Sequence, residues 1–115
     1  MDLFEIQTED LQDATVIHVH GEVDLATAPM LQNALQSAIE SRRHVVVDLA
    51  NATYMDLSGF RTLVEAKGAL GERQALAVAA SSPLVHRVIE VIELGTILPV
   101  YHSPQEALDF VRSRR

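Results

Sequence analysis

Residues 45–49 read Val-Val-Val-Asp-Leu, a nearly continuous apolar run. This pattern is typical of a strand buried on both faces, as in a parallel sheet that helices cover from both sides. The segment before it has helical rather than strand periodicity, because its apolar residues recur at i, i+3, i+4, i+7 and i+8. Those residues are Leu31, Ala34, Leu35, Ala38 and Ile39. The sequence therefore predicts a helix followed by a central strand.

The same alternation continues to the end of the chain. A second helix is expected to start near 56–58 and to stop at Gly71, before a strand over 76–80. A third helix follows Ser82-Pro83, and a short strand covers 97–100. Ser103, Pro104 and Glu106 form a capping box that predicts the last helix.

The amino-terminal part differs, because two short strands precede the first helix. They cover 4–8 and 14–20, with a polar stretch between them and Gly21 at the end of the second. Thr27 is expected to cap the first helix, and Pro29 to lie in its first turn, where a missing N–H costs nothing. The order is thus ββαβαβαβα, which predicts an α/β fold with a mixed sheet and right-handed crossovers. We expect the first strand to lie antiparallel at an edge, and residues 1–115 to form one domain.

Composition excludes several classes of function. The 115 residues include 16 acidic and nine basic side chains, for a net charge of −7, and no cysteine. The acidic balance argues against binding to nucleic acid, and the absence of cysteine removes disulfides and thiolate metal sites. No apolar run is long enough to cross a membrane, and the start of the chain lacks the basic region of a signal peptide. A soluble cytoplasmic protein is expected.

Charge is unevenly distributed along the chain. The first 41 residues contain eight acids and no lysine or arginine, whereas the remainder is close to neutral. An acidic end can steer a basic partner toward the protein. A solvated acidic face that maintains solubility is the simpler interpretation, and it is the one favoured here.

The search for catalytic residues finds little. The sequence has no glycine-rich phosphate loop and no G-x-S-x-G elbow. Asp48 is expected near the end of its strand, where a receiver domain has its phospho-accepting aspartate. The sequence lacks the acidic pair and the lysine that a receiver domain also needs, so we expect Asp48 to bond nearby loop amides. His18 and His20 share a strand face, but no third ligand completes a metal site, so ordinary surface histidines are expected. No cofactor is implied.

Two segments are more informative, because each follows the carboxyl end of a strand. Residues 21–29 read Gly-Glu-Val-Asp-Leu-Ala-Thr-Ala-Pro, and residues 54–60 read Tyr-Met-Asp-Leu-Ser-Gly-Phe. In open α/β sheets, ligands and partners usually meet the protein at this edge. Asp56 or Ser58 is also a good helix cap, a role that does not exclude binding.

These two segments, with the Val-Val-Val-Asp-Leu strand between them, resemble a STAS domain of the kind found in anti-sigma factor antagonists. The resemblance covers nearly the whole chain and implies a mixed sheet with helices mainly on one face. It also implies a binding protein without enzymatic activity, which captures an anti-sigma factor that is often a histidine-kinase-like serine kinase. By this resemblance, the expected partner-binding residues are Glu22, Asp24, Thr27, Asp56, Leu57, Ser58 and Gly59.

One position departs from the family pattern. In the family, the kinase phosphorylates a serine or threonine directly after the aspartate at the start of the second helix, which releases the antagonist. Leu57 occupies that position here and cannot accept phosphate. Ser58 is a possible acceptor one residue later, but a helix turns about 100° per residue, so its hydroxyl faces another direction. Capping or packing is the role favoured for Ser58. Leu57 itself either contacts a partner or packs inward.

Two alternatives stay open at this point. The chain could be a STAS subunit of another system, such as the cytoplasmic subunit of an ABC lipid transporter or a stressosome-type scaffold. It could instead be a small α/β enzyme with Asp48, Asp56 and histidines in one cleft. Neither the cognate partner nor the oligomeric state follows from the sequence.

Overall fold

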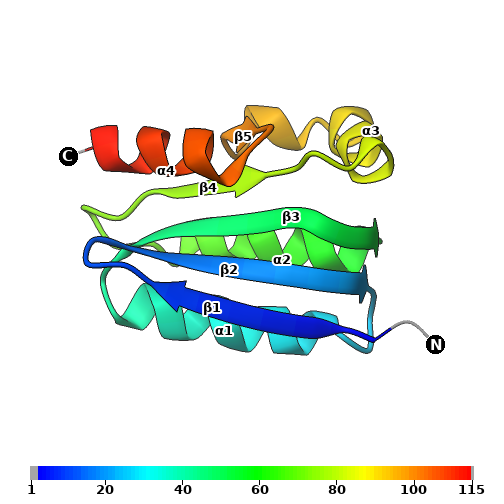
Figure 1. Ribbon diagram of the computed structural model, residues 1–115, viewed down its shortest axis with the longest axis horizontal. Coiled ribbons are helices and arrows are strands. Elements are labelled where there is room, and N and C mark those ends of the chain that lie inside the picture. The colour runs from blue at the N-terminus through cyan, green and yellow to red at the C-terminus, as the bar shows by residue number, and fades with distance from the viewer. Residues whose placement is uncertain (1–2, 115) are drawn as a thin grey trace.

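A computed structural model describes residues 3–114 and contains a single five-stranded sheet (Figure 1). The elements follow in the predicted order, with a short 3₁₀ turn added before the last strand. They are β1 (Glu5–Asp10), β2 (Ala14–Val23), α1 (Ala28–Glu40), β3 (His44–Met55), α2 (Leu57–Gly68), β4 (Leu76–Ala79), α3 (Pro83–Val91), η1 (Leu94–Thr96), β5 (Val100–Tyr101) and α4 (Pro104–Ser113).

The strands lie in the order β1-β2-β3-β4-β5. β1 is antiparallel to β2 at one edge, and the other neighbouring pairs are parallel. The prediction of a mixed α/β sheet with an antiparallel first strand is therefore confirmed. Because β2, β3 and β4 run in one direction, the loops that leave β2 and β3 emerge at the same end of the molecule (Figure 1).

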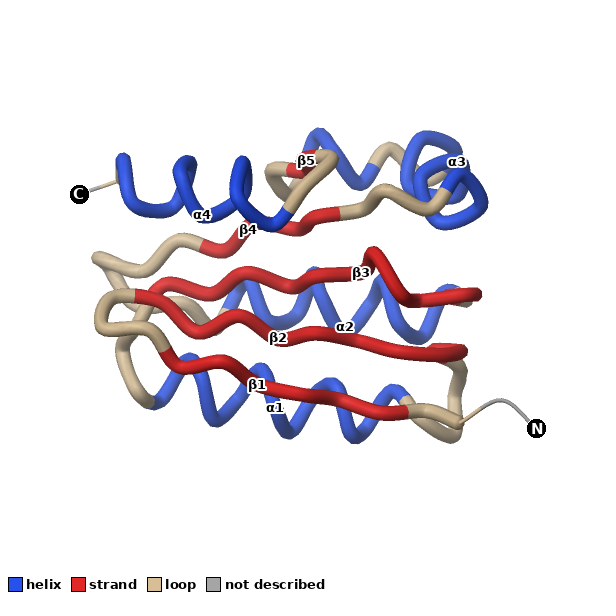
Figure 2. Tube along the Cα trace, viewed as in Figure 1, coloured by secondary structure: helices blue, strands red, loops and turns tan. Residues whose placement is uncertain are grey.

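Two hydrophobic cores enclose the sheet. The larger one joins one sheet face to α1, α2 and α3, and it includes Ile17, Leu35 and Leu63. The smaller one lies on the other face, where Ala107 and Val111 of α4 pack on the sheet. Helices thus cover mainly one face, while α4 covers part of the other (Figure 2). In the part of the chain that the structure describes, no helix is long and apolar enough to span a membrane.

The two central strands are longer than predicted. Gly21 does not end β2, which continues to Val23, and β3 extends six residues past Leu49 to Met55. The register between β2 and β3 shifts twice, between His18 and His20 and between Gly21 and Glu22. At each shift β3 contains one residue more than β2, which is the pattern of a β-bulge. The extension carries both strands out to the predicted binding segments.

Other boundaries differ by a few residues. The last strand is Val100–Tyr101 rather than 97–100, because residues 94–96 form the 3₁₀ turn η1. Helix α2 ends at Gly68, before Gly71. The capping box of α4 is present as predicted, with the Ser103 hydroxyl accepting a hydrogen bond from the Glu106 backbone N–H at 3.2 Å.

Candidate functional site

The two predicted segments lie side by side. β2 and β3 pair up to Val23 and Met55, and the backbone N–H of Asp56 then donates to the Val23 carbonyl at 3.0 Å. This bond connects the β2–α1 turn to the first residue before α2. Residues 22–27 and 56–59 therefore form one continuous surface at the carboxyl end of the sheet.

Asp24 organises the first turn. Its Oδ1 atom accepts hydrogen bonds from the backbone N–H groups of Ala26 at 2.9 Å and Thr27 at 3.0 Å. These bonds fix the loop in the way expected of an Asx turn. Among the described residues, nothing donates to the other oxygen, Oδ2. One carboxylate oxygen therefore shapes the turn and the other remains available.

Thr27 acts differently from the predicted cap. It occupies the N-cap position of α1, but its side chain makes no capping bond. Its hydroxyl donates to the Glu22 carbonyl at 2.9 Å and accepts from the Asp24 N–H at 2.9 Å. Thr27 thus locks the turn to the end of β2, and its contribution is to position Asp24.

Asp56 caps α2 as predicted. Its Oδ1 accepts from the backbone N–H of Ser58 at 2.9 Å, and the Ser58 hydroxyl donates to the same oxygen. The Ser58 carbonyl accepts a further bond from the Thr62 hydroxyl at 2.8 Å. Ser58 is half-buried, and its hydroxyl is bonded to the cap residue Asp56, so Asp56 rather than Ser58 caps the helix.

Gly59 has a packing role that the sequence does not reveal. A Cβ atom at this position would lie 2.7 Å from Met55 Cγ and 2.8 Å from Val23 Cγ1. Only glycine lets the first turn of α2 approach the ends of both strands this closely. The missing side chain of Gly59 thus permits close packing of α2 on the ends of β2 and β3.

The surface carries two prominent leucines. Leu57, the first residue of α2, is 69% exposed, and Leu25 in the neighbouring turn is 79% exposed. The exposure excludes one of the two roles left open for Leu57, because the side chain does not pack inward. Tyr54, which pairs with Glu22 across β2 and β3, is a third exposed large side chain. Leu25 and Tyr54 are not among the partner-binding residues expected from the sequence. Leu25 lies outside the helical periodicity of α1, and this was a signal that its side chain is exposed.

The site is a surface rather than a pocket. A groove of about 350 Å³ lies between α1 and α2, but residues such as Leu35, Ile39 and Ala66 line it. The other hollows described on the molecule are likewise lined by residues outside 22–27 and 56–59. An exposed apolar patch with acidic neighbours is typical of a surface that binds another protein.

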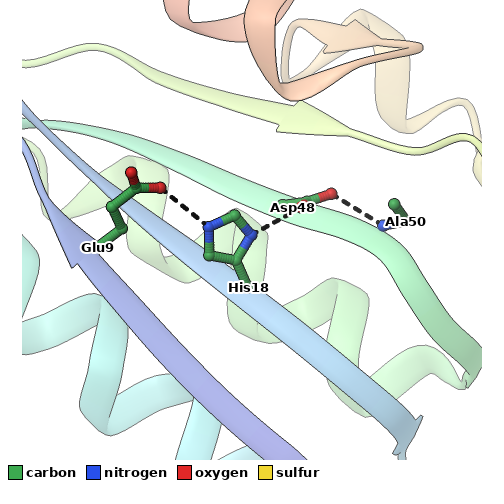
Figure 3. A network of polar contacts seen from close by, with 4 residues as sticks. All are labelled: Glu9, His18, Asp48 and Ala50. Carbon is green, nitrogen blue, oxygen red and sulfur yellow. Dashed lines mark hydrogen bonds and ion pairs between the residues drawn. The ribbon is translucent and has the colours of Figure 1, made fainter.

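Asp48 and His18 form a separate polar network on the α4 face of the sheet (Figure 3). Asp48 Oδ2 lies 2.8 Å from His18 Nδ1, and Glu9 Oε1 lies 3.2 Å from the opposite ring nitrogen. The Asp48 carboxylate also accepts from the Ala50 N–H at 3.0 Å, where the β3 register shifts. Asp48 is thus in the middle of β3 rather than near its end, because the strand is longer than predicted.

The electrostatics of this network centre on His18. Burial by itself lowers the pKa of His18, but the hydrogen bonds to Asp48 and Glu9 outweigh it, so the pKa is raised above its ordinary value. The imidazole therefore favours the charged form, which bridges two carboxylates. His20 is not part of the network, and the part of the chain that the structure describes contains no group of three ligands able to hold a metal ion.

The enzyme alternative required Asp48, Asp56 and histidines in one cleft. Asp48 pairs with His18 of β2, and Asp56 follows the pair of Met55 with Val23. The two aspartates are therefore separated by the length of about six residues of β2, roughly 20 Å at about 3.3 Å per residue. His86 and His102 stack on each other beside α3 instead, with ring centroids 5.1 Å apart. The structure thus pairs Asp48 with His18 but places Asp56 elsewhere, so Asp48, Asp56 and the histidines do not share one cleft.

The chain has similarity to proteins of known role. A family sequence model described as "Mlab, STAS domain" matches residues 6–99. The anti-sigma F factor antagonist of Paenibacillus polymyxa is 28% identical over 107 residues, covering 90% of this chain and 92% of that protein. The anti-sigma-B factor antagonist of Listeria monocytogenes is 32% identical over 99 residues, covering 84% and 85%. A crystal structure of an anti-sigma factor antagonist from Mycobacterium paratuberculosis superposes with a TM-score of 0.90 at 28% identity, covering 96% of each chain.

Proposed function

Since this chain belongs to the STAS domain family, we propose that it is an anti-sigma factor antagonist, which sequesters an anti-sigma factor and so frees a sigma factor. The observation that supports this most is the union of the β2–α1 turn and the start of α2 into one exposed surface. The chain acts by binding, without a reaction of its own, and it acts in the cytoplasm.

The chemistry of the surface defines the partner. Leu25 and Leu57 provide apolar contact area, and the same two segments carry the negative charges of Glu22, Asp24 and Asp56. A complementary partner has an apolar area bordered by lysine or arginine. The histidine-kinase-like serine kinase expected from the sequence is the partner class that we propose.

Regulation differs from that of the family pattern. In that pattern, a phosphate added at the start of α2 places about −1.5 to −2 charges next to the acidic side chains and repels the partner. Here Leu57 occupies the acceptor position, and the hydroxyl of Ser58 is engaged with Asp56. We therefore propose that the chain is not switched off at the usual acceptor position.

The test is direct capture followed by a binding measurement. Purified protein is used to retain partners from a lysate of the source organism, and the retained anti-sigma factor is then purified and titrated calorimetrically. Leu57→Asp places a charge in the centre of the surface and should abolish binding, whereas Arg73→Glu, an exposed change in the α2–β4 loop, should not. Equal affinity of the two variants would contradict the proposed site.

A second candidate function has one observation in its favour. The matching family model carries the name Mlab, and a STAS subunit of another assembly, such as an ABC lipid transporter, was left open from the sequence. The same capture experiment separates the two. An ABC-type ATPase retained in place of an anti-sigma factor would favour the second candidate.

A further inference from the structure

Helix α3 presents apolar side chains to solvent as well as to the core. Val85 and Ile89 point into the larger core and are buried. Leu84 and Val91, however, are 53% and 73% exposed, and with the partly buried Val88 they recur at i, i+4 and i+7. Val88 packs against the larger core, so the apolar side chains that α3 exposes to solvent are those of Leu84 and Val91.

Helix α3 lies at the same end of the molecule as the proposed binding surface (Figure 1). β4 pairs with β3 only from Val45 to Asp48, so the later part of β3 has no strand on that side. Helix α3 packs against β3 instead, and it lies at the same end of the molecule as the carboxyl ends of β2 and β3 (Figure 1). Leu84 is in the first turn of this helix.

Three successive strand-to-helix junctions thus each expose a leucine. They are Leu25 after β2, Leu57 after β3 and Leu84 after β4. In open α/β sheets, this edge is where partners and ligands bind. The third junction therefore lies at the same edge of the sheet as the first two.

The first two junctions are acidic, whereas the third carries an exposed arginine. Glu22, Asp24 and Asp56 make the first two junctions acidic. At the third junction Arg87 follows Leu84 by one helical turn, is exposed, and forms no ion pair with any residue from 3 to 114. A partner that covers the whole edge must therefore offer cations at one end and a carboxylate at the other.

We propose that the anti-sigma factor bound at the first two junctions also contacts Leu84 and Arg87 of α3. Leu84 fits an apolar depression in that partner, and Arg87 pairs with an acidic residue beside it. This rests on the proposed function. The opposite charges at the two ends fix the orientation of the partner, because reversed docking would place like charges together.

The experiment uses the full chain and the purified anti-sigma factor obtained in the capture test. Calorimetric titrations compare wild type with Leu84→Ser, Arg87→Glu and Leu57→Asp, and Arg73→Glu serves as the charge-reversal control. We expect Leu84→Ser and Arg87→Glu each to weaken binding about tenfold or more, as for residues inside an interface. Circular dichroism and thermal unfolding establish that each variant is folded.

The outcomes separate this inference from the proposed function. Loss of binding in Leu57→Asp with unchanged affinity in both α3 variants would overturn the inference and leave the proposed function intact. Failure to bind any anti-sigma factor would overturn both. If Leu84→Ser instead changes only self-association, measured by light scattering, the occupant of α3 is a second copy and the inference is wrong. A Leu84→Met variant, which keeps the apolar side chain, should retain binding.

Discussion

The backbone N–H of Asp56 donates a hydrogen bond to the carbonyl of Val23, with an N···O distance of 3.0 Å. This bond continues the pairing of β2 and β3 beyond the last residue of β3. It joins two loops that are more than 30 positions apart in the sequence. The carboxylates of Asp24 and Asp56 consequently belong to one surface whose geometry is set by the strands below it.

Asp24→Asn should weaken partner binding without a large loss of stability. The amide oxygen of asparagine can still accept from the N–H groups of Ala26 and Thr27, so the turn is retained, while the negative charge is removed. We expect a tenfold or larger loss of affinity for a basic partner, which corresponds to about 1.4 kcal/mol or more. Calorimetric titration and urea unfolding measure the two quantities.

Asp24→Ala provides the contrast, because it removes the turn bonds as well as the charge. It should lower the free energy of unfolding by about 1 kcal/mol, as for the loss of a capping side chain. Binding as tight as that of wild type in Asp24→Asn would show that the charge of Asp24 has no role in recognition.

Leu57→Ser should convert the chain into a substrate of the partner kinase. The side chain at this position is exposed, so a hydroxyl placed there is accessible, and the helix N-terminus stabilises an attached phosphate. Phosphate incorporation should be high in Leu57→Ser and low in wild type, as measured by intact-protein mass spectrometry after incubation with kinase and ATP. The Ser58→Ala change, made in wild type and in Leu57→Ser, identifies which residue carries the phosphate. Rapid phosphorylation of Ser58 in wild type would contradict the expectation.

The element order and the meeting of the two loops could be predicted from the sequence. Alternating apolar periodicity defined the strands and helices, and parallel strands bring their carboxyl ends to one edge by topology alone. That argument placed Asp24 and Asp56 on one edge without knowledge of any distance. The capping roles of Asp56 and Ser103 could also be predicted, because helix capping depends on the residue type and its immediate neighbours in sequence.

The remaining features depend on contacts that local patterns do not report. The bulges that lengthen β3 arise from its register with β2, so Asp48 was placed at a strand end rather than in the middle. The pairing of His18 with Asp48 crosses 30 positions of sequence. The exposure of Leu25 and Leu84 depends on which side of the β2–α1 turn and of the first turn of α3 faces the core, and a single apolar residue at such a position does not indicate this.

Gly21→Ala should destabilise the fold strongly. Gly21 has a φ of 94°, a conformation that costs an alanine energy, and a Cβ there would lie 2.5 Å from the backbone carbonyl oxygen of Leu3. Strain and overpacking together should lower the free energy of unfolding by about 2 kcal/mol or more. Gly68→Ala is the matched control, since a Cβ at Gly68 meets nothing within 4 Å, and it should be neutral or slightly stabilising. Similar urea midpoints for the two variants would refute the role assigned to Gly21.

The stability of the protein should fall as the pH rises through the pKa of His18. The pKa is raised in the folded state by Asp48 and Glu9, so the charged imidazole stabilises the fold fully below the unfolded value of 6.5. That contribution is lost as the pH passes the higher folded pKa, because the deprotonated ring no longer pairs with two carboxylates. Urea unfolding between about pH 6 and 9 should show this decline in wild type and a flatter profile in His18→Gln, which does not titrate. An NMR titration of His18 that gave a pKa at or below 6.5, or identical pH profiles for the two proteins, would show that the bridge from Glu9 through His18 to Asp48 does not stabilise the sheet.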